Sequence, residues 1–150
     1  AMTDFVVMVE QTGYMFVTGP NVVKTVTHEE VSSEDLGGAS THSTKSGVTH
    51  LTALNDMDCI GQLKKLLSYI PQNCEDVVLK IPYTLADETR EVLETIIPES
   101  TNQPYDIRAV IAGICDTDSF FEIHKAYAEN IVVGFARLAG RSIGIVASHP

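Results

Sequence analysis

Two groups of strand-like and helix-like segments, separated by an acidic connector, constrain the fold of this chain most strongly. In the first group, residues 5–9, 14–18 and 48–54 have the apolar runs or alternation typical of strands. Residues 57–70 carry apolar side chains at helical spacing, and Pro71 ends the pattern. This group therefore predicts strands and helices that share one sheet.

Two shorter helical segments lie between the second and third of these strands. Gly19-Pro20 favours a helix start, because proline is tolerated at the first helical position. Ser32 and Asp35 have the spacing of a capping box, so a single helical turn is expected there, with Gly37 able to end it.

The second group begins with a helix opened by Pro104. Three strands are predicted after it, at residues 119–124, 130–138 and 141–147. Ala139-Gly140 is short enough to join the last two strands as a hairpin. The connector between the groups, residues 71–98, is rich in carboxylates, with a short helix expected within residues 85–97. The order of segments predicts a mixed α/β fold in which neither half is a complete domain.

Composition narrows the classes of partner. The 150-residue chain has a formal charge of -10, with 20 acidic against 10 basic side chains, and such a surface repels nucleic-acid backbones. No apolar run approaches the roughly 18–20 residues that a membrane span requires. Apolar segments lie close to both ends of the sequence, so we expect the chain to be part of a longer protein.

Cysteine and histidine are scattered in the sequence. The spacing of Cys59, Cys74 and Cys115 indicates neither a disulfide framework nor a zinc site, and Cys59 and Cys115 are expected to be inert core thiols. The five histidines form no metal-binding motif, so no metal is predicted. His42 is expected to order the loop around it by hydrogen bonding.

The segment from Glu34 to Gly47 is the strongest candidate site. Gly37 and Gly38 are followed by small hydroxyl residues, and a backbone without Cβ atoms lets a ligand approach its N–H groups. The spacing leaves two interpretations open. One is a helix end followed by a polar turn, and the other is an oxyanion hole that holds a developing negative oxygen.

Several longer motifs in the sequence resemble those of a known enzyme family. Asp4-Phe-Val-Val-Met-Val, Phe16-Val-Thr-Gly-Pro-Asn-Val-Val-Lys24, Glu34-Asp-Leu-Gly-Gly-Ala-x-Thr-His42 and Ser46-Gly-Val-x-His50 resemble the carboxyltransferase subunits of biotin-dependent acyl-CoA carboxylases, the propionyl-CoA carboxylase beta chain above all. The run from Phe120 to Val146 resembles the same family. Only the connector, residues 71–98, differs from the sequence pattern of this family.

The resemblance implies a crotonase-like (ClpP/crotonase) α/β fold of ββα units, with parts of two domains. Residues 1–71 would end the N-terminal carboxyltransferase domain, residues 72–98 would form the acidic connector, and residues 99–150 would begin the C-terminal domain. The implied reaction moves a carboxyl group from carboxybiotin to an acyl-CoA, with propionyl-CoA the expected substrate. Because biotin carries that chemistry, the lack of a strong general base in the sequence is understandable.

Residue roles and partners also follow from the resemblance. Gly37 and Gly38 match a family glycine pair that holds the thioester enolate, so they are the predicted catalytic residues. The predicted substrate-binding residues are Ala39, Thr41 and Ser46. The implied partners are acyl-CoA, a biotinylated carrier or biotin carboxylase subunit, and further copies of the subunit in a hexamer. The implied location is the bacterial cytoplasm or the mitochondrial matrix.

Three alternatives stay open at this point. The same fold serves methylmalonyl- or glutaconyl-CoA decarboxylases and transcarboxylases, and no residue of this chain separates them from carboxylases. The 150-residue chain alone is expected to be an inactive structural or interaction unit, because the family's active sites lie between subunits. In the full-length protein, Gly38→Val is expected to cut activity while folding survives.

Overall fold

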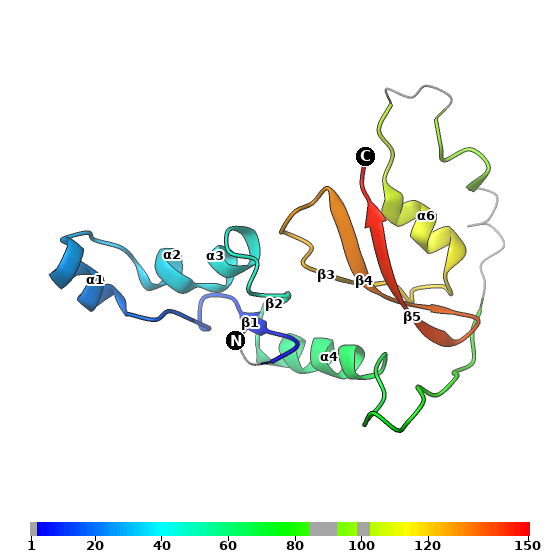
Figure 1. Ribbon diagram of the computed structural model, residues 1–150, viewed down its shortest axis with the longest axis horizontal. Helices are drawn as coiled ribbons and strands as arrows, with labels where there is room; N and C mark the ends of the chain where they lie inside the picture. The colour runs from blue at the N-terminus through cyan, green and yellow to red at the C-terminus, as the bar shows by residue number, and fades with distance from the viewer. Residues whose placement is uncertain (1–2, 85–92, 99–102) are drawn as a thin grey trace. The chain divides into compact units, whose positions relative to one another are not determined.

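The computed structural model describes residues 3–84, 93–98 and 103–150 (Figure 1). The chain divides into two compact units, and each is considered by itself. The first comprises residues 1–63 with 124–127, and the second comprises residues 64–123 with 128–150. The segment expected to form a short helix at residues 85–97 lies mostly outside the described residues.

The first unit is built on a parallel strand pair. β1 (Val7–Val9) pairs with β2 (Leu51–Ala53), with Val7 opposite Leu51 and Val9 opposite Ala53. Parallel strands need a long crossover between them, and here it contains three helices. These are α1 (Pro20–Thr27), α2 (Ser33–Gly37) and α3 (Ala39–Thr44). Met8, Ala39, Leu51 and Ala53 are buried and form the centre of this unit.

The predicted strand at residues 14–18 is wrong. Tyr14 makes one isolated antiparallel bridge to Gly38, and Val17 is fully exposed. The apolar side chains in this segment matched a strand pattern, but among the described residues the segment has no neighbouring strand with which to form a ladder. Local propensity without a partner does not make a strand.

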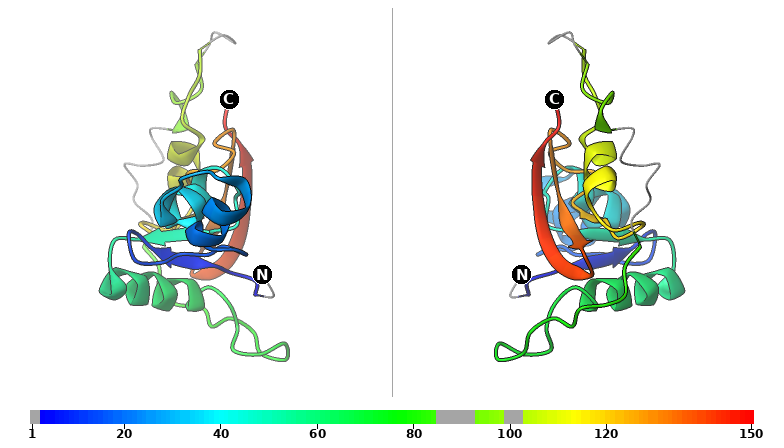
Figure 2. Two further views of the ribbon diagram at one scale, coloured as in Figure 1. Left: turned by 90° about the vertical axis from the view of Figure 1, so that its left-hand side faces the viewer. Right: turned by 90° about the vertical axis from the view of Figure 1, so that its right-hand side faces the viewer.

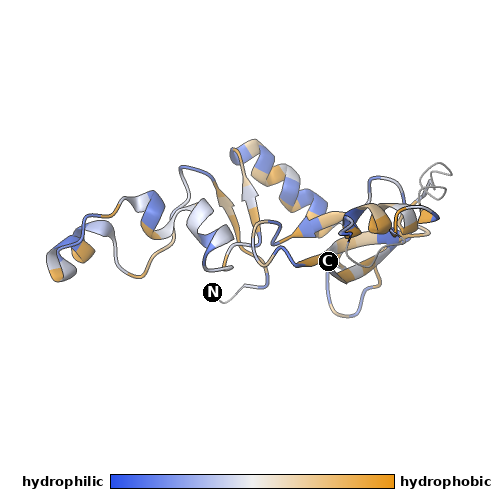
Figure 3. Cartoon of the chain, turned by 90° about the horizontal axis from the view of Figure 1, so that it is seen from above, coloured by the Kyte–Doolittle hydropathy of each residue, from blue (hydrophilic) through white to orange (hydrophobic). Residues whose placement is uncertain are grey.

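The helix predicted at residues 57–70 is observed as α4 (Asp56–Leu67). Its start is fixed by Asn55, whose Oδ1 accepts a hydrogen bond from the Asp58 amide at 3.0 Å. Its surface mixes hydrophilic and hydrophobic residues (Figure 3). Of the predicted apolar positions within α4, only Leu66 is buried, so periodicity identified the helix correctly but not the environment of its apolar side chains.

The second unit is a three-stranded antiparallel sheet with a helix packed on it (Figures 1 and 2). The helix is α6 (Ile107–Ile114), and the strands are β3 (Phe121–Ile123), β4 (Ile131–Leu138) and β5 (Arg141–Ser148). The predicted helix is present but begins three residues after Pro104, because Asp106 is its cap and accepts a hydrogen bond from the Arg108 amide at 2.9 Å.

The core of the second unit lies between α6 and the β4–β5 hairpin. Ile111 and Cys115 pack against Val132 and Ala136, and Val132 and Ala136 have no exposed surface. The predicted hairpin is confirmed, with Leu138 opposite Arg141 across the turn. Both turn residues have positive φ, 52° at Ala139 and 76° at Gly140, as a two-residue turn matching the twist of its strands requires.

Candidate functional site

The Glu34–Gly47 segment forms a corner between two short helices instead of an open loop. Ser32 caps α2, since its Oγ accepts from the Asp35 amide at 3.1 Å, and the helix ends at Gly37. Gly38 is at once the C-cap of α2 and the N-cap of α3. The predicted capping turn is therefore confirmed, whereas the hydroxyl residues after Gly38 are helical.

Both glycines are required by lack of space. A Cβ added at Gly37 would lie 2.1 Å from the Met15 carbonyl oxygen. One added at Gly38 would lie 2.3 Å from the Glu34 carboxyl carbon and 2.7 Å from the Glu34 carbonyl oxygen. The backbone of Gly38, with φ of -75° and ψ of 170°, suits any residue. A valine at Gly38 would have to displace Glu34, so Gly38→Val is expected to lower stability as well as activity, and whether folding survives stays a prediction.

Backbone hydrogen bonds decide what this corner can offer to a ligand. The Gly38 amide donates to the Glu34 carbonyl at 2.9 Å, and the Gly37 carbonyl accepts from the Met15 amide at 2.8 Å. Gly38 also forms an antiparallel bridge with Tyr14, and the next residue, Ala39, is fully buried. A negative oxygen at the corner would thus have to replace the Glu34 carbonyl as the acceptor of the Gly38 amide.

The three predicted substrate-binding residues are all engaged within the unit. Ala39 is fully buried. Thr41 Oγ1 donates to the carbonyl oxygens of Glu34 and Asp35, at 3.2 and 3.1 Å. Ser46 Oγ lies 2.8 Å from His42 Nδ1. These side chains hold the corner together, so any contact with substrate would have to come from the backbone or require them to exchange partners.

His42 orders this segment, as predicted. Its Nε2 lies 2.5 Å from the Met15 carbonyl oxygen, and its Nδ1 contacts Ser46 Oγ. Because a carbonyl only accepts, Nε2 carries the hydrogen and Nδ1 accepts from the serine hydroxyl. The imidazole therefore ties α3 to the segment before α1 and plays a positional role.

A second histidine contact in the first unit was not foreseen. The rings of His50 and His124 lie in contact, tilted by 43° with centroids 4.3 Å apart, and His50 Nδ1 accepts a hydrogen bond from the Val6 amide at 3.1 Å. Burial, and then the neighbouring His124, lower the pKa of His50 below its ordinary value. The two residues are far apart in sequence, so no local signal could have paired them.

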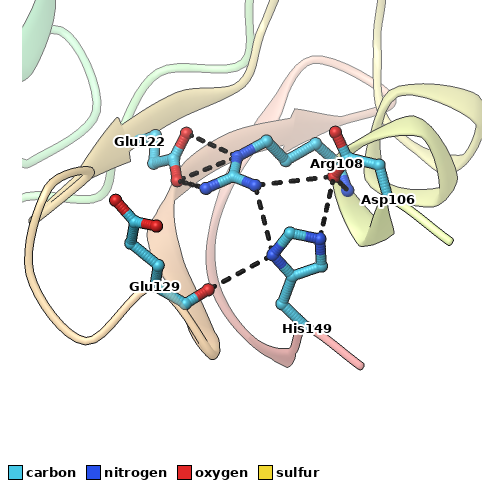
Figure 4. Close-up of polar contacts among 5 residues, drawn as sticks. All are labelled: Asp106, Arg108, Glu122, Glu129 and His149. Carbon is cyan, nitrogen blue, oxygen red and sulfur yellow. Dashed lines mark hydrogen bonds and ion pairs between the residues drawn. The ribbon is translucent and has the colours of Figure 1, made fainter. Parts of the chain in front are cut away.

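The second unit holds an ionic network at the start of α6 (Figure 4). The Arg108 guanidinium faces the Glu122 carboxylate, with Nη2 2.6 Å from Oε1 and Nε 2.9 Å from Oε2. Asp106 lies 3.5 Å from Arg108 Nη1, and His149 contacts both. Hydrogen bonding to Glu122 raises the pKa of Arg108. This network connects α6 to β3 and to the residue that follows β5, and both carboxylates in it face the single guanidinium.

The remaining candidate groups offer little chemistry. The described residues contain no cluster of three or more histidine, cysteine or carboxylate side chains that could hold a metal ion. All three cysteines are free, and Cys115 is buried. Burial, and then Asp116, raise the pKa of the Cys115 thiol, so it stays protonated at neutral pH. None of the helices that the structure describes combines the length and apolar character of a membrane span.

The sequence matches the carboxyl transferase domain family over residues 1–150. The chain belongs to this family. It is 50% identical to a Mycobacterium tuberculosis protein named as the beta5 subunit of a biotin-dependent acetyl-/propionyl-coenzyme A carboxylase. It is 47% identical to the methylmalonyl-CoA decarboxylase subunit alpha of Veillonella parvula. Both matches include the whole chain but only 29% and 30% of those relatives, so the chain spans less than a third of their length.

Solved structures with the same fold include a transcarboxylase and an acyl-CoA carboxylase. The transcarboxylase 12S structure, described as a hexamer assembly with hydrolysed methylmalonyl-coenzyme A bound, matches 99% of the chain with a TM-score of 0.91 and 41% identity. A single-chain, multi-domain long-chain acyl-CoA carboxylase matches with a TM-score of 0.78 at 21% identity, which supports the fold alone. The predicted crotonase-like α/β fold is therefore confirmed.

Proposed function

We propose that the full-length protein containing this chain transfers a carboxyl group from carboxybiotin to an acyl-CoA, with propionyl-CoA giving methylmalonyl-CoA. The observation that carries this proposal is the match over all 150 residues, at 50% identity, to a relative named as an acetyl-/propionyl-CoA carboxylase subunit. The relative's name includes both acetyl- and propionyl-CoA, so the choice of propionyl-CoA comes from the motif resemblance.

A second candidate activity has specific support. The Veillonella parvula relative is a methylmalonyl-CoA decarboxylase subunit at 47% identity, and the transcarboxylase 12S structure is 41% identical. Both reactions would use the same acyl-CoA chemistry as the leading proposal. They differ in where the carboxyl group goes, which partner proteins decide.

The proposal includes partners and a location. Biotin would be carried by a partner protein or domain and would supply the transferable carboxyl group. The full-length subunit would assemble with copies of itself, as the transcarboxylase 12S hexamer does. It would work in the bacterial cytoplasm or the mitochondrial matrix. Residues 1–71 would complete one carboxyltransferase domain and residues 99–150 would begin the next, joined by residues 72–98.

At residue level, we propose that the Gly37–Gly38 corner holds the thioester oxygen of acyl-CoA as it becomes negative. Support comes from the motif around this corner, in which Gly37 and Gly38 match the glycine pair of the family. For the Gly38 amide to take part, it must exchange the Glu34 carbonyl for the substrate oxygen. Ala39, Thr41 and Ser46 would then act by fixing the corner, and any direct substrate contact would come from their backbone.

The test is a substrate panel with the full-length subunit and its biotin partner. Acetyl-, propionyl- and methylcrotonyl-CoA are offered with carboxybiotin, and the carboxylated thioester is measured. A higher kcat/KM for propionyl-CoA supports the carboxylase proposal. Turnover only in the reverse direction, from methylmalonyl-CoA, would favour the decarboxylase alternative, and no turnover in either direction would refute both.

The purified 150-residue chain is the matched control for this assay. We expect it to show no carboxyl transfer, since it spans less than a third of the relatives' length. Measurable turnover by this chain alone would contradict the proposal that its active site needs other parts of the protein.

A further inference from the structure

The second unit contains a pocket that the carboxyl-transfer proposal does not use. The pocket has a volume of about 510 Å³ and lies beside the end of α4 and the turn end of β4. This volume falls in the range of about 300–1,000 Å³ typical of small-molecule sites. Its lining is mainly apolar, with two charged side chains: Leu67, Ile70, Val78, Ile81, Asp76 and Arg137 are among the residues that form it.

Arg137 is held in place by its surroundings. Its Cζ lies 4.1 Å from the centroid of the Tyr69 ring, and its Nη2 donates to both the carbonyl oxygen and Oγ of Ser68 at 2.9 Å. The Tyr69 ring is itself fixed, because it is only 3% exposed and its hydroxyl donates to the Ser119 carbonyl at 2.5 Å. The guanidinium therefore has one orientation before any ligand arrives, which lowers the entropy cost of binding.

The charge of Arg137 has no anionic partner in the described residues. None of the ion pairs there includes Arg137, although acidic side chains outnumber basic ones by 20 to 10 in the chain. Its Nε is buried without an acceptor, and its hydrogen-bond partners Ser68 and Tyr69 are uncharged. Arg108, in contrast, is neutralised by Glu122 at 2.6 Å. A fixed and unpaired guanidinium beside a pocket favours an anion.

We propose that this pocket binds a small amphipathic monocarboxylate. Its carboxylate accepts hydrogen bonds from Arg137 Nη1, and its hydrocarbon body lies against Leu67, Ile70 and Val78. Asp76 also lines the pocket, and its carboxylate accepts from Asn73 Nδ2 at 2.6 Å. A second negative charge in the pocket disfavours dianions such as phosphate groups, so a single charge with an apolar tail fits best.

The first experiment compares two probes on the wild-type full-length subunit by isothermal titration calorimetry. Hexanoate has the charge and the tail, whereas hexanamide has a similar shape without the charge. We expect hexanoate to bind at least about tenfold more tightly, because hydrogen bonds to charged groups contribute about 1.5–3 kcal/mol. A crystal soaked with hexanoate should show its carboxylate at Arg137. Equal affinity for the two probes, or no binding of either, overturns the proposal.

Variants of the full-length subunit test which side chains of the pocket contribute to hexanoate binding. Arg137→Met should weaken hexanoate binding at least about tenfold, and Arg137→Lys should retain part of the affinity, because lysine keeps the charge but not the planar stack on Tyr69. Asp76→Asn should tighten binding by removing the opposing charge. Unchanged affinity in Arg137→Met, or a full-length crystal structure in which another segment of the subunit fills the pocket, would refute the proposal.

Discussion

Asp116 should control the stability of the β4–β5 turn. The residue is only 6% exposed, and its two carboxylate oxygens accept hydrogen bonds from the amides of Ala139, at 2.9 Å, and Gly140, at 2.7 Å. These amides lie in the two-residue turn, where they have no other acceptor in the described part of the chain. Asp116→Ala would leave both of them without a partner.

The expected magnitude follows from counting these donors. A buried donor without an acceptor costs about 1–3 kcal/mol, so Asp116→Ala should destabilise the turn by about 2–6 kcal/mol. Asp116→Asn should cost about half as much, because the amide side chain keeps one acceptor oxygen and presents N–H groups where the second one was. Asp118→Asn is the matched control. Asp118 has a positive φ of 54°, which asparagine tolerates, so this change should stay within about 0.5 kcal/mol.

Hydrogen exchange of the full-length subunit, followed by mass spectrometry, measures this effect locally. Peptides containing Ala139 and Gly140 should lose protection in the order Asp116→Ala, Asp116→Asn, Asp118→Asn, with the last equal to wild type. A local readout avoids assuming two-state unfolding, which large assemblies often violate. If Asp116→Ala left the protection of the turn unchanged, the inference that this carboxylate holds the hairpin would be refuted.

Three further predictions concern the first unit and the turn. Gly38→Ala should lower stability by about 1–3 kcal/mol through overpacking against Glu34, seen as a lower melting temperature. Alanine keeps the amide at position 38, but the added Cβ would shift it, so kcat of the folded enzyme should also fall if the corner is an oxyanion hole, and an unchanged kcat would reject that role. His50 has a folded-state pKa below its unfolded value near 6.5, so its contribution to stability is present above pH 6.5 and is lost as pH falls through the folded-state pKa. In urea titrations between pH 7.5 and 5, the free energy of unfolding should therefore fall less steeply with pH in His50→Gln than in the wild type. Gly140→Ala should destabilise the hairpin, since its Cβ would lie 2.0 Å from the Ile81 carbonyl oxygen at a φ of 76°, and an unchanged urea midpoint would contradict this.

The sequence predicted those elements that depend on local rules. The capping spacing of Ser32 and Asp35 predicted the start of α2, and the Ala139-Gly140 pair predicted the β4–β5 hairpin correctly. The strand predicted at residues 14–18 failed because a strand needs a neighbour, and no local pattern contains that information. The exposed apolar side chains of α4 likewise depend on packing, not on periodicity.

The candidate site was only partly predictable for the same reason. The ordering role of His42 could be predicted because it lies beside the glycines in sequence. In contrast, the ring contact of His50 with His124 and the unpaired charge of Arg137 each depend on residues brought together by the fold. Motif resemblance identified the family, but it contains no distances, so it could not show that Glu34 already occupies the Gly38 amide.

The engagement of these groups limits how this chain can contribute to carboxyl transfer. The Thr41 hydroxyl donates to carbonyl oxygens of α2, and the Ser46 hydroxyl is hydrogen-bonded to His42. The Cys115 thiol is protonated in the core. Because these side chains already have hydrogen-bond partners, the corner can stabilise a negative charge only through backbone amides, which do so because they are held in a fixed orientation. Rigid packing around Gly37 and Gly38 is then a condition for that role and not an alternative to it. Stability and kcat should therefore fall together in Gly38→Ala if both roles hold, and separate if only packing does.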